Sequence, residues 1–156
     1  MKSSAIAVWE GGLKDGRGTI TAEKGAFKAT PYSAAQRFEG AGGPGTTPEE
    51  LIAAAHAACF SMASSGALAA AGMTPKRLEV SATVTLEPKD GKPTVTSSHL
   101  VMKAQVPGAD DAKFQEIVNG AKVGCPISRL LNTEITLEAT LDDSDAPRAG
   151  RTDVAP

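Results

Sequence analysis

The stretch Thr47-Pro48-Glu49-Glu50-Leu51-Ile52-Ala53-Ala54-Ala55-His56-Ala57-Ala58-Cys59-Phe60-Ser61 decides the fold, because it specifies one long apolar helix in the middle of the chain. Thr47 is a good N-cap, Pro48 suits the first helical position, and Glu50 completes a capping box. The pattern predicts a helix running to about Ala71, with Gly72 as its C-cap. Because its side chains are small or apolar nearly all round, we expect this helix to be buried centrally.

The segments on either side of this helix alternate between strand and helix signals. Turn residues and period-two patterns predict a meander of short strands before the helix and a hairpin after it. A second amphipathic helix, a short helical turn and a last strand follow. The expected strands are 6–9, 18–22, 26–29, 77–87, 95–106 and 134–141, and the expected helical segments after the first are 110–124 and 126–131. Strands grouped in this way predict an α+β fold with antiparallel sheets.

Length and composition limit the class of protein. The 156 residues suit one domain, which we place at residues 1–141, and the polar residues 142–156 are expected to be a disordered tail. The net charge of −2 argues against nucleic acid or an anionic membrane as partner. We find no uninterrupted apolar run of the roughly 18 residues that span a bilayer, and no secretory signal. The expected location is the cytoplasm.

The chain has two cysteines, and in a reducing compartment such a pair is more often redox-active than a permanent cross-link. Cys59 lies in the apolar helix, where it is either a small buried residue or a reactive thiolate. Burial raises a thiol pKa, so a reactive Cys59 needs a nearby cation, for which Arg37 and Arg17 are candidates. Cys125 precedes Pro126 at a helix start, where backbone N–H groups favour a thiolate; the alternative is a buried junction residue.

Other polar residues near the cysteines have both structural and functional interpretations. Glu49 suits the helix dipole, but a functional Glu49 would orient and charge-balance an arginine. Because it precedes Cys59 by ten helical residues, about 15 Å, it would act most simply across a dimer interface. His56 lies on the same side of the helix as Cys59 and is either a packed histidine, a base, or part of a zinc site with Cys125 and His99. The spacing lacks the paired ligands typical of structural zinc.

Four segments together resemble a known family. They are Arg37-Phe38-Glu39-Gly40, Thr47-Pro48-Glu49-Glu50-Leu51-Ile52, Ala54-Ala55-His56-Ala57-Ala58-Cys59-Phe60-Ser61-Met62 and Lys122-Val123-Gly124-Cys125-Pro126-Ile127-Ser128. In this order they resemble the OsmC/Ohr family of thiol-dependent hydroperoxide peroxidases, and most closely its OsmC branch. The resemblance extends over about residues 6–141. It implies an intertwined homodimer in which two sheets wrap around a pair of central helices, with active sites at the subunit interface.

The resemblance also implies roles for individual residues. Cys59 would be the peroxidatic thiolate and Cys125 the resolving thiol, while Arg37 stabilises the thiolate and Glu49 holds Arg37. The Ohr branch carries its arginine in a Gly-Gly-Arg-Asp-Gly stretch, which here is Gly11-Gly12-Leu13-Lys14-Asp15-Gly16. Because of that difference, Arg37 is the residue expected to stabilise the thiolate, and Lys14 or Arg17 are the alternative cations. The reductant would be a lipoyl-type or other small dithiol, and no metal or organic cofactor is implied.

The function expected from the sequence is therefore the reduction of organic hydroperoxides, and of hydrogen peroxide, in oxidative or osmotic stress defence. Two alternatives remain open at this point. One is a non-catalytic carrier that binds an apolar ligand between the helices and merely buries its cysteines. The other is a thiol sensor or hydrolase in which His56 activates Cys59.

Overall fold

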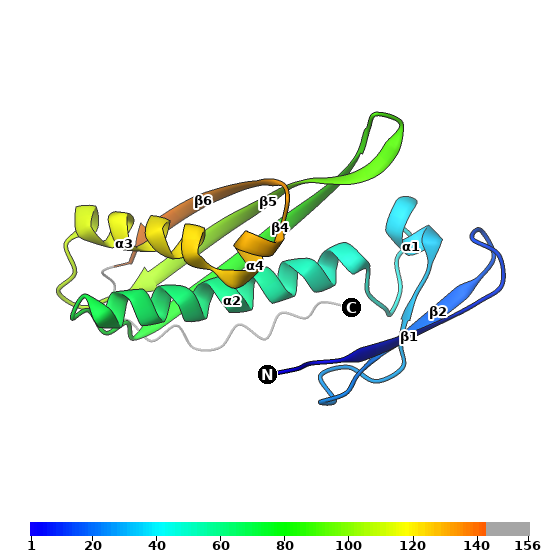
Figure 1. The fold of residues 1–156 in the computed structure, drawn as a ribbon, viewed down its shortest axis with the longest axis horizontal. Helices are drawn as coiled ribbons and strands as arrows, with labels where there is room; N and C mark the ends of the chain where they lie inside the picture. The colour runs from blue at the N-terminus through cyan, green and yellow to red at the C-terminus, as the bar shows by residue number, and fades with distance from the viewer. Residues whose placement is uncertain (143–156) are drawn as a thin grey trace.

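The computed structural model describes residues 1–142, and these form two three-stranded sheets and two long helices with two short ones (Figure 1). This mixed architecture confirms the predicted α+β class. Residues 143–156, and with them almost all of the predicted tail, lie outside the described part. The elements are β1 (Ala5–Glu10), β2 (Arg17–Ala22), β3 (Thr30–Tyr32), α1 (Ala34–Phe38), α2 (Pro48–Ala70), β4 (Arg77–Lys89), β5 (Lys92–Gln105), α3 (Asp111–Gly124), α4 (Pro126–Leu130) and β6 (Glu134–Leu141).

The N-terminal sheet has the antiparallel order β1-β2-β3. Its third strand is Thr30–Tyr32, so the strand predicted at residues 26–29 is wrong. The physical reason is a compact turn. The Ala22 N–H donates to the Phe27 carbonyl at 3.0 Å, and Ala29 has a left-handed φ of 48° with its N–H donated to the Thr21 hydroxyl. These bonds turn the chain back before it pairs again.

A short helix, α1, precedes the glycine-rich loop of residues 40–45, at a place where none of the expected helical segments lies. Ser33 caps it by accepting from the Gln36 N–H at 3.2 Å, and the Gln36 side chain donates to the Pro44 carbonyl at 3.1 Å. Gly45 has a φ of 147°, and a Cβ there would stand 2.6 Å from the Pro31 carbonyl oxygen. The loop therefore folds back tightly, which brings α1 beside the start of α2.

The ends of α2 lie close to where the sequence predicts them. The Thr47 hydroxyl accepts from the Glu50 N–H at 3.1 Å, but the Glu50 carboxylate accepts from the Thr46 hydroxyl, so the reciprocal half of the expected capping box is replaced. At the other end the Met73 N–H donates to the Leu68 carbonyl, with Gly72 at a φ of 77°. That geometry is a Schellman motif, which needs a left-handed residue at this position.

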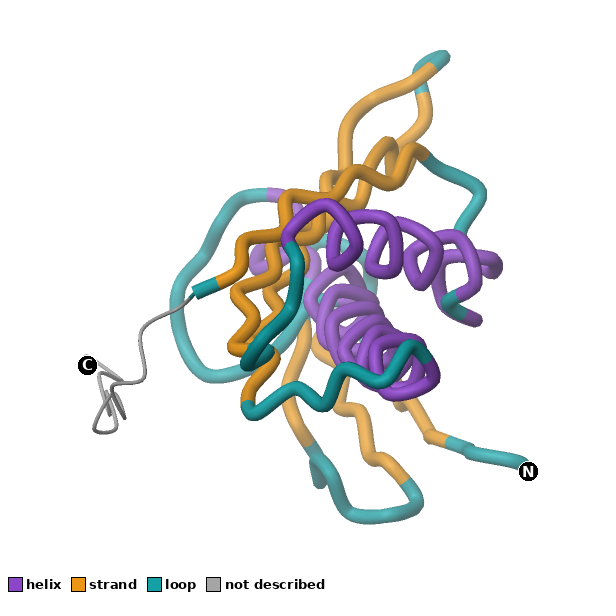
Figure 2. Tube along the Cα trace, turned by 90° about the vertical axis from the view of Figure 1, so that its left-hand side faces the viewer, coloured by secondary structure: helices purple, strands orange, loops and turns teal. Residues whose placement is uncertain are grey.

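The second sheet has the order β4-β5-β6, and it corrects the expectation of antiparallel pairing throughout. The β4–β5 hairpin is antiparallel, but β6 runs parallel to β5. The crossover through α3 and α4 is long enough to return the chain to the same end of the sheet, which parallel pairing requires. Both long helices lie on one face of this sheet (Figure 2). At its end Asp142 still donates a backbone hydrogen bond to Ala104, at 2.8 Å.

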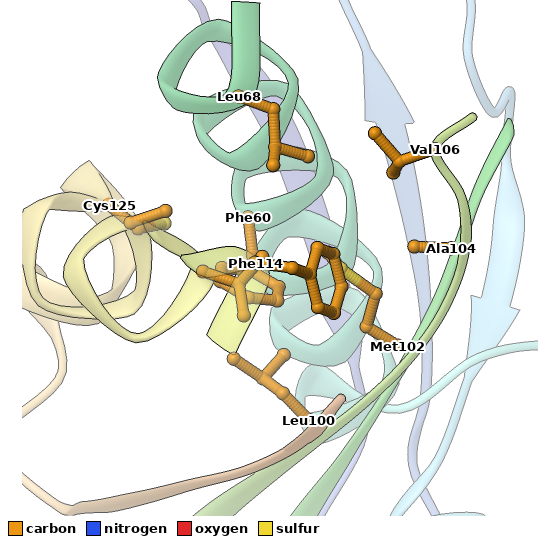
Figure 3. Close-up of a cluster of buried hydrophobic side chains, with 10 residues drawn as sticks. Phe60, Leu68, Leu100, Met102, Ala104, Val106, Phe114 and Cys125 are labelled. Atoms are coloured by element: carbon orange, nitrogen blue, oxygen red, sulfur yellow. The ribbon is translucent and has the colours of Figure 1, made fainter. Parts of the chain in front are cut away.

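The hydrophobic core fills the space between this sheet and helices α2 and α3 (Figure 3). Phe60 and Leu68 from α2 meet Phe114 from α3, and each of these three side chains is fully buried. Burying one such side chain contributes about 1.5–3 kcal/mol, so this layer holds α3 on α2. The other buried apolar residues are Leu100, Met102, Ala104, Val106, Val118, Ala121 and Cys125.

One face of α2 is covered and the rest is not. The buried residues His56, Phe60, Ser64 and Leu68 recur every fourth position. On the other side small apolar residues are exposed, and Met62 retains 69% of its accessible surface. By length and mean hydropathy α2 would suffice to cross a membrane, but its buried face packs on the sheet and α3 as in a core helix. Within residues 1–142 nothing covers its apolar remainder.

Candidate thiol site

Two free thiols meet where α2 packs against the junction of α3 and α4. Cys59 lies one helical turn beyond His56, at the border between the buried and the uncovered face of α2, and is partly exposed. Cys125 is fully buried at the joint that ends α3 and begins α4. The two thiols are close enough for each to shift the pKa of the other. The fold thus brings together the two cysteines that the sequence singled out.

The surroundings shift the two thiols in opposite directions. Burial raises the pKa of Cys59, and Cys125 raises it further against a lowering contribution from the Ile127 backbone. Burial also disfavours the Cys125 thiolate, but the Ser128 backbone, Cys59, the Ser128 hydroxyl and the Ile127 backbone together lower the pKa of Cys125 below its ordinary value. The Cys125 side chain makes no capping hydrogen bond at the start of α4, as far as the described residues show. Within one chain, Cys125 is therefore the more acidic thiol.

Arg37 and Glu49 form an ion pair at the start of α2. Arg37 Nη2 lies 2.6 Å from Glu49 Oε1, and Arg37 Nε donates to both carboxylate oxygens, at 3.1 and 3.2 Å. The guanidinium carbon also lies 5.0 Å from the centroid of the Phe38 ring. Glu49 lies in the first turn of α2, whereas Cys59 lies near its middle, about 15 Å farther along the helix axis. In a single chain, the arginine and the candidate thiolate are therefore separate.

A cavity of about 300 Å³ opens beside Arg37. Its wall is largely apolar and combines the N-terminal sheet, α1 and the first residue of α2. Lys14 lies in the β1–β2 turn next to Leu13, which lines this cavity, and Arg17 is paired in register with Glu10. The cavity offers one cation beside apolar surface. It is lined by Trp9, Leu13, Tyr32, Ser33, Ala34, Arg37, Phe38 and Pro48.

His56 is fully buried, and both of its ring nitrogens have partners other than Cys59. Nδ1 lies 2.7 Å from the Ser98 hydroxyl on β5, and Nε2 lies 2.9 Å from the Ser128 hydroxyl on α4. Burial lowers the pKa of His56, which keeps the ring neutral. Sequence reasoning missed both serines. The spacing from Cys125 to Ser128 is one helical turn and was a usable signal, whereas nothing in the sequence pointed to Ser98.

The histidines and cysteines do not gather into a metal site. His99 Nδ1 lies 2.7 Å from the Thr136 hydroxyl on the neighbouring strand, apart from His56. Within residues 1–142, no group of three or more His, Cys, Asp or Glu side chains has the arrangement needed to hold a metal ion. The thiols are therefore surrounded by hydroxyls, backbone groups and apolar side chains.

Comparison with known proteins places this arrangement in a family. Residues 40–140 match the family model described as OsmC-like protein. The chain belongs to the OsmC family. It is 47% identical over 135 residues to Peroxiredoxin OsmC of Escherichia coli (strain K12), an alignment that covers 86% of this chain and 93% of that protein.

More distant OsmC-family relatives belong to the organic hydroperoxide resistance proteins. The chain is 33% identical over 112 residues to the Organic hydroperoxide resistance protein of Xanthomonas axonopodis pv. citri (strain 306), covering 70% of this chain and 75% of that one. Among solved structures, the Organic Hydroperoxide Resistance Protein OhrB of Bacillus subtilis superposes with a TM-score of 0.67 and 29% identity, over 88% of this chain and 98% of that one. The higher identity to the OsmC protein confirms the predicted branch.

Proposed function

We infer that this OsmC-family chain is a thiol-dependent peroxidase that reduces organic hydroperoxides in defence against hydroperoxide stress. The single observation that carries the inference is the pair of free thiols in contact, one partly exposed and one buried. The partly exposed sulfur is accessible to a peroxide, and the buried one is close enough to react with it afterwards. The names of the relatives, a peroxiredoxin and organic hydroperoxide resistance proteins, support the same chemistry.

The proposed reaction assigns one step to each thiol. The Cys59 thiolate attacks the O–O bond of the hydroperoxide, releases the alcohol after proton uptake, and becomes a sulfenic acid. The Cys125 sulfur then attacks the sulfenic sulfur, so that a disulfide forms and one water leaves. A lipoyl-type or other small dithiol restores both thiols by exchange and becomes a disulfide itself. Atoms and electrons balance in these three steps without a metal or an organic cofactor.

Stabilisation of the Cys59 thiolate is proposed to come from a second copy of the chain. Burial disfavours the thiolate, and the Arg37–Glu49 pair of the same chain lies about 15 Å away along α2. Cys59 borders the uncovered apolar face of α2, and burial of such a face is what a homodimer achieves. A second copy packed on this face would bring its own Arg37, held by Glu49, toward the Cys59 sulfur.

The same arrangement supports finer proposals about substrate and location. The apolar wall of the cavity beside Arg37 favours an alkyl or aryl hydroperoxide over hydrogen peroxide, which the enzyme would reduce more slowly. The guanidinium would polarise the peroxide oxygen while the organic group contacts apolar side chains. A thiol pair that must be reduced after each turnover suits a reducing compartment, so we place the protein in the cytoplasm.

The proposal is tested by intact mass after one equivalent of cumene hydroperoxide. The wild-type chain is expected to lose two hydrogens, the Cys125→Ser chain to gain one oxygen, and the Cys59→Ser chain to do neither. Hydroperoxide consumption is measured on the same samples with a dithiol present. Equal consumption by wild type and Cys59→Ser would contradict a peroxidase and favour the apolar carrier.

A further inference from the structure

A buried series of hydrogen bonds runs from the second sheet to the α3–α4 junction, and the peroxidase steps proposed above do not use it. It begins at Ser98 on β5, passes through His56 on α2 and reaches Ser128 on α4. His56 and Ser98 are fully buried, and Ser128 is 8% exposed. A buried histidine with two short hydroxyl contacts, on three separate elements, is a built arrangement and not a chance surface contact.

Cys125 lies beside the Ser128 end of these hydrogen bonds. Ser128 follows Cys125 by three residues on the first turn of α4, so its hydroxyl lies on the same side as the thiol. The Ser128 side chain is one of the groups that lower the pKa of Cys125, so its hydroxyl is near enough to the sulfur to donate to the thiolate in one of its orientations. His56 has no corresponding effect on Cys59, for which burial, Ile127 and Cys125 are the causes of the shift.

Counting protons shows that the tautomer of His56 and the charge of Cys125 are linked. A neutral imidazole has one N–H, and each serine hydroxyl has one hydrogen to donate. When the Ser128 hydroxyl donates to His56 Nε2, its hydrogen faces away from the sulfur. When Nε2 carries the proton and donates to Ser128, that hydroxyl is free to donate to the sulfur, while Ser98 donates to Nδ1.

We propose that Ser98, His56 and Ser128 form a proton-transfer network that serves Cys125, the resolving thiol. The inference rests on the proposed function. As the Cys125 sulfur attacks the Cys59 sulfenic sulfur, the S–S bond forms and the S–O bond breaks. The thiol proton passes through Ser128 to His56 Nε2, which makes a transient imidazolium, and the imidazolium returns a proton through Ser128 to the departing hydroxide, which leaves as water. No external oxidant is consumed in this step, because the sulfenic acid supplies the oxidising equivalent.

The first test needs no peroxide. In a Cys59→Ser background Cys125 is the remaining cysteine of the chain, and its ionisation is followed by thiolate absorbance in the ultraviolet. Cys59 is the titratable group that acts on Cys125, so this background also removes the coupled titration. Ser128→Ala and His56→Gln are each expected to lower the thiolate fraction at a fixed pH about tenfold, as loss of a hydrogen bond to a charged group implies.

Ser64→Ala is the matched control. Ser64 lies on the same buried face of α2, two turns beyond His56, and among the described residues its hydroxyl is buried without a hydrogen-bond partner. We expect Ser64→Ala to leave the Cys125 thiolate fraction unchanged. Should His56→Gln not fold, Ser98→Ala removes only the outer hydroxyl and is expected to lower the fraction by a smaller factor. The same thiolate fraction in Ser128→Ala or Ser98→Ala as in Ser64→Ala would overturn the network.

The second test separates the two chemical steps with both cysteines present. After one equivalent of hydroperoxide, His56→Gln is expected to slow disulfide formation by about 100-fold, at the lower end of what proton transfer contributes. The sulfenic acid then accumulates and is trapped by dimedone, which it is not in Ser64→Ala. Disulfide formation at the rate of Ser64→Ala would refute the role of His56. Absence of both sulfenic acid and disulfide in every chain would instead refute the peroxidase and leave the thiolate titration standing.

Discussion

At the scale of single residues, Arg37 and Glu49 interact through a geometry that lysine cannot reproduce. Nε and Nη2 of Arg37 both reach the Glu49 carboxylate, whose side chain is only 12% exposed. The planar guanidinium can hold the carboxylate on one edge and present its other N–H groups to a second anion. A lysine at this position would have a single point charge for both tasks.

Under the proposed mechanism we therefore expect Arg37→Lys to lower kcat/KM for an organic hydroperoxide by about 10- to 100-fold, because the thiolate and the peroxide oxygen would lose a preorganised donor. Steady-state consumption of cumene hydroperoxide measures this effect. Arg17→Lys, in the Arg17–Glu10 register pair of the N-terminal sheet, is the control and should retain wild-type kcat/KM. A loss of kcat/KM in Arg17→Lys with none in Arg37→Lys would instead assign the stabilisation of the thiolate to Arg17, at the start of β2.

His56 gives a second prediction at this scale, from the direction of its pKa. Burial lowers the pKa of His56 in the folded chain below its ordinary value of 6.5. As the pH falls through about 6.5, the unfolded chain binds a proton that the folded chain refuses, so the free energy of unfolding decreases. Above that pH both states are neutral and this contribution is constant.

Urea unfolding between about pH 8 and about pH 5 measures the slope, above the range where carboxylates titrate. His56→Gln is expected to be less stable throughout but to lose less stability on acidification than wild type. Ser64→Ala, on the same buried face of α2, removes no titratable group, so it is the matched control and should keep the wild-type slope. Identical slopes for wild type and His56→Gln would show that His56 is not held neutral by the fold.

At the scale of elements, α2 was predicted well because its signals are local. Thr47 and Pro48 at one end and Gly72 at the other determine its length through backbone chemistry that needs no distant partner. The strand at 26–29 was misplaced because a turn held by Thr21 and Phe27 competes with extended structure, and the sequence pattern does not resolve that competition. The short helix α1 was not predicted, because five residues are too few to show a helical period of apolar side chains.

The exposed side of α2 leads to a prediction about assembly. Met62 is 69% exposed on a helix whose residues are apolar nearly all round. If a second copy covers this side, Met62→Glu buries a charge in an apolar interface, which costs several kcal/mol and dissociates the dimer. Sedimentation should then report a monomer, and hydroperoxide turnover should fall with it.

Ala112→Glu, at an exposed position in the first turn of α3, is the control for adding a carboxylate to a helix surface. It is expected to keep both the dimer and the turnover. A Met62→Glu chain that remains dimeric would mean that copies associate through another surface. A wild-type chain that is active as a monomer would remove the need for a second copy altogether.

At the scale of the whole molecule, the sequence predicted the thiol pair better than its surroundings. Cys59 and Cys125 were identified from their local contexts, and the fold brings them together by packing α2 against the α3–α4 junction. The Ser98 contact to His56 was beyond prediction, since it depends on which strand faces α2. The parallel β6 was missed for a related reason, because strand direction follows from how the α3–α4 crossover returns, and pattern alone does not encode that.

The N-terminal sheet projects away from the body formed by α2, α3 and the second sheet, and α1 lies at the same end (Figure 1). Arg37 belongs to α1. A projecting sheet of this kind is explained if the N-terminal sheet of each copy packs on the body of the other copy. In that case the predicted single domain, residues 1–141, would consist of the N-terminal sheet and the helical body, and each of these would pack mainly on the second copy. It also means that each active site would combine Cys59 of one copy with Arg37 of the other.

Mixing two inactive variants tests this arrangement directly. Arg37→Ala lacks the guanidinium and Cys59→Ser lacks the thiol, so each homodimer should be inactive. In a mixed dimer with sites built across the interface, one of the two sites combines an intact Cys59 with an intact Arg37. Random reassociation of equal amounts makes half the dimers mixed, so about a quarter of wild-type hydroperoxide turnover is expected to return. Sites contained within one chain would regain none, because every chain in the mixture lacks either the thiol or the guanidinium.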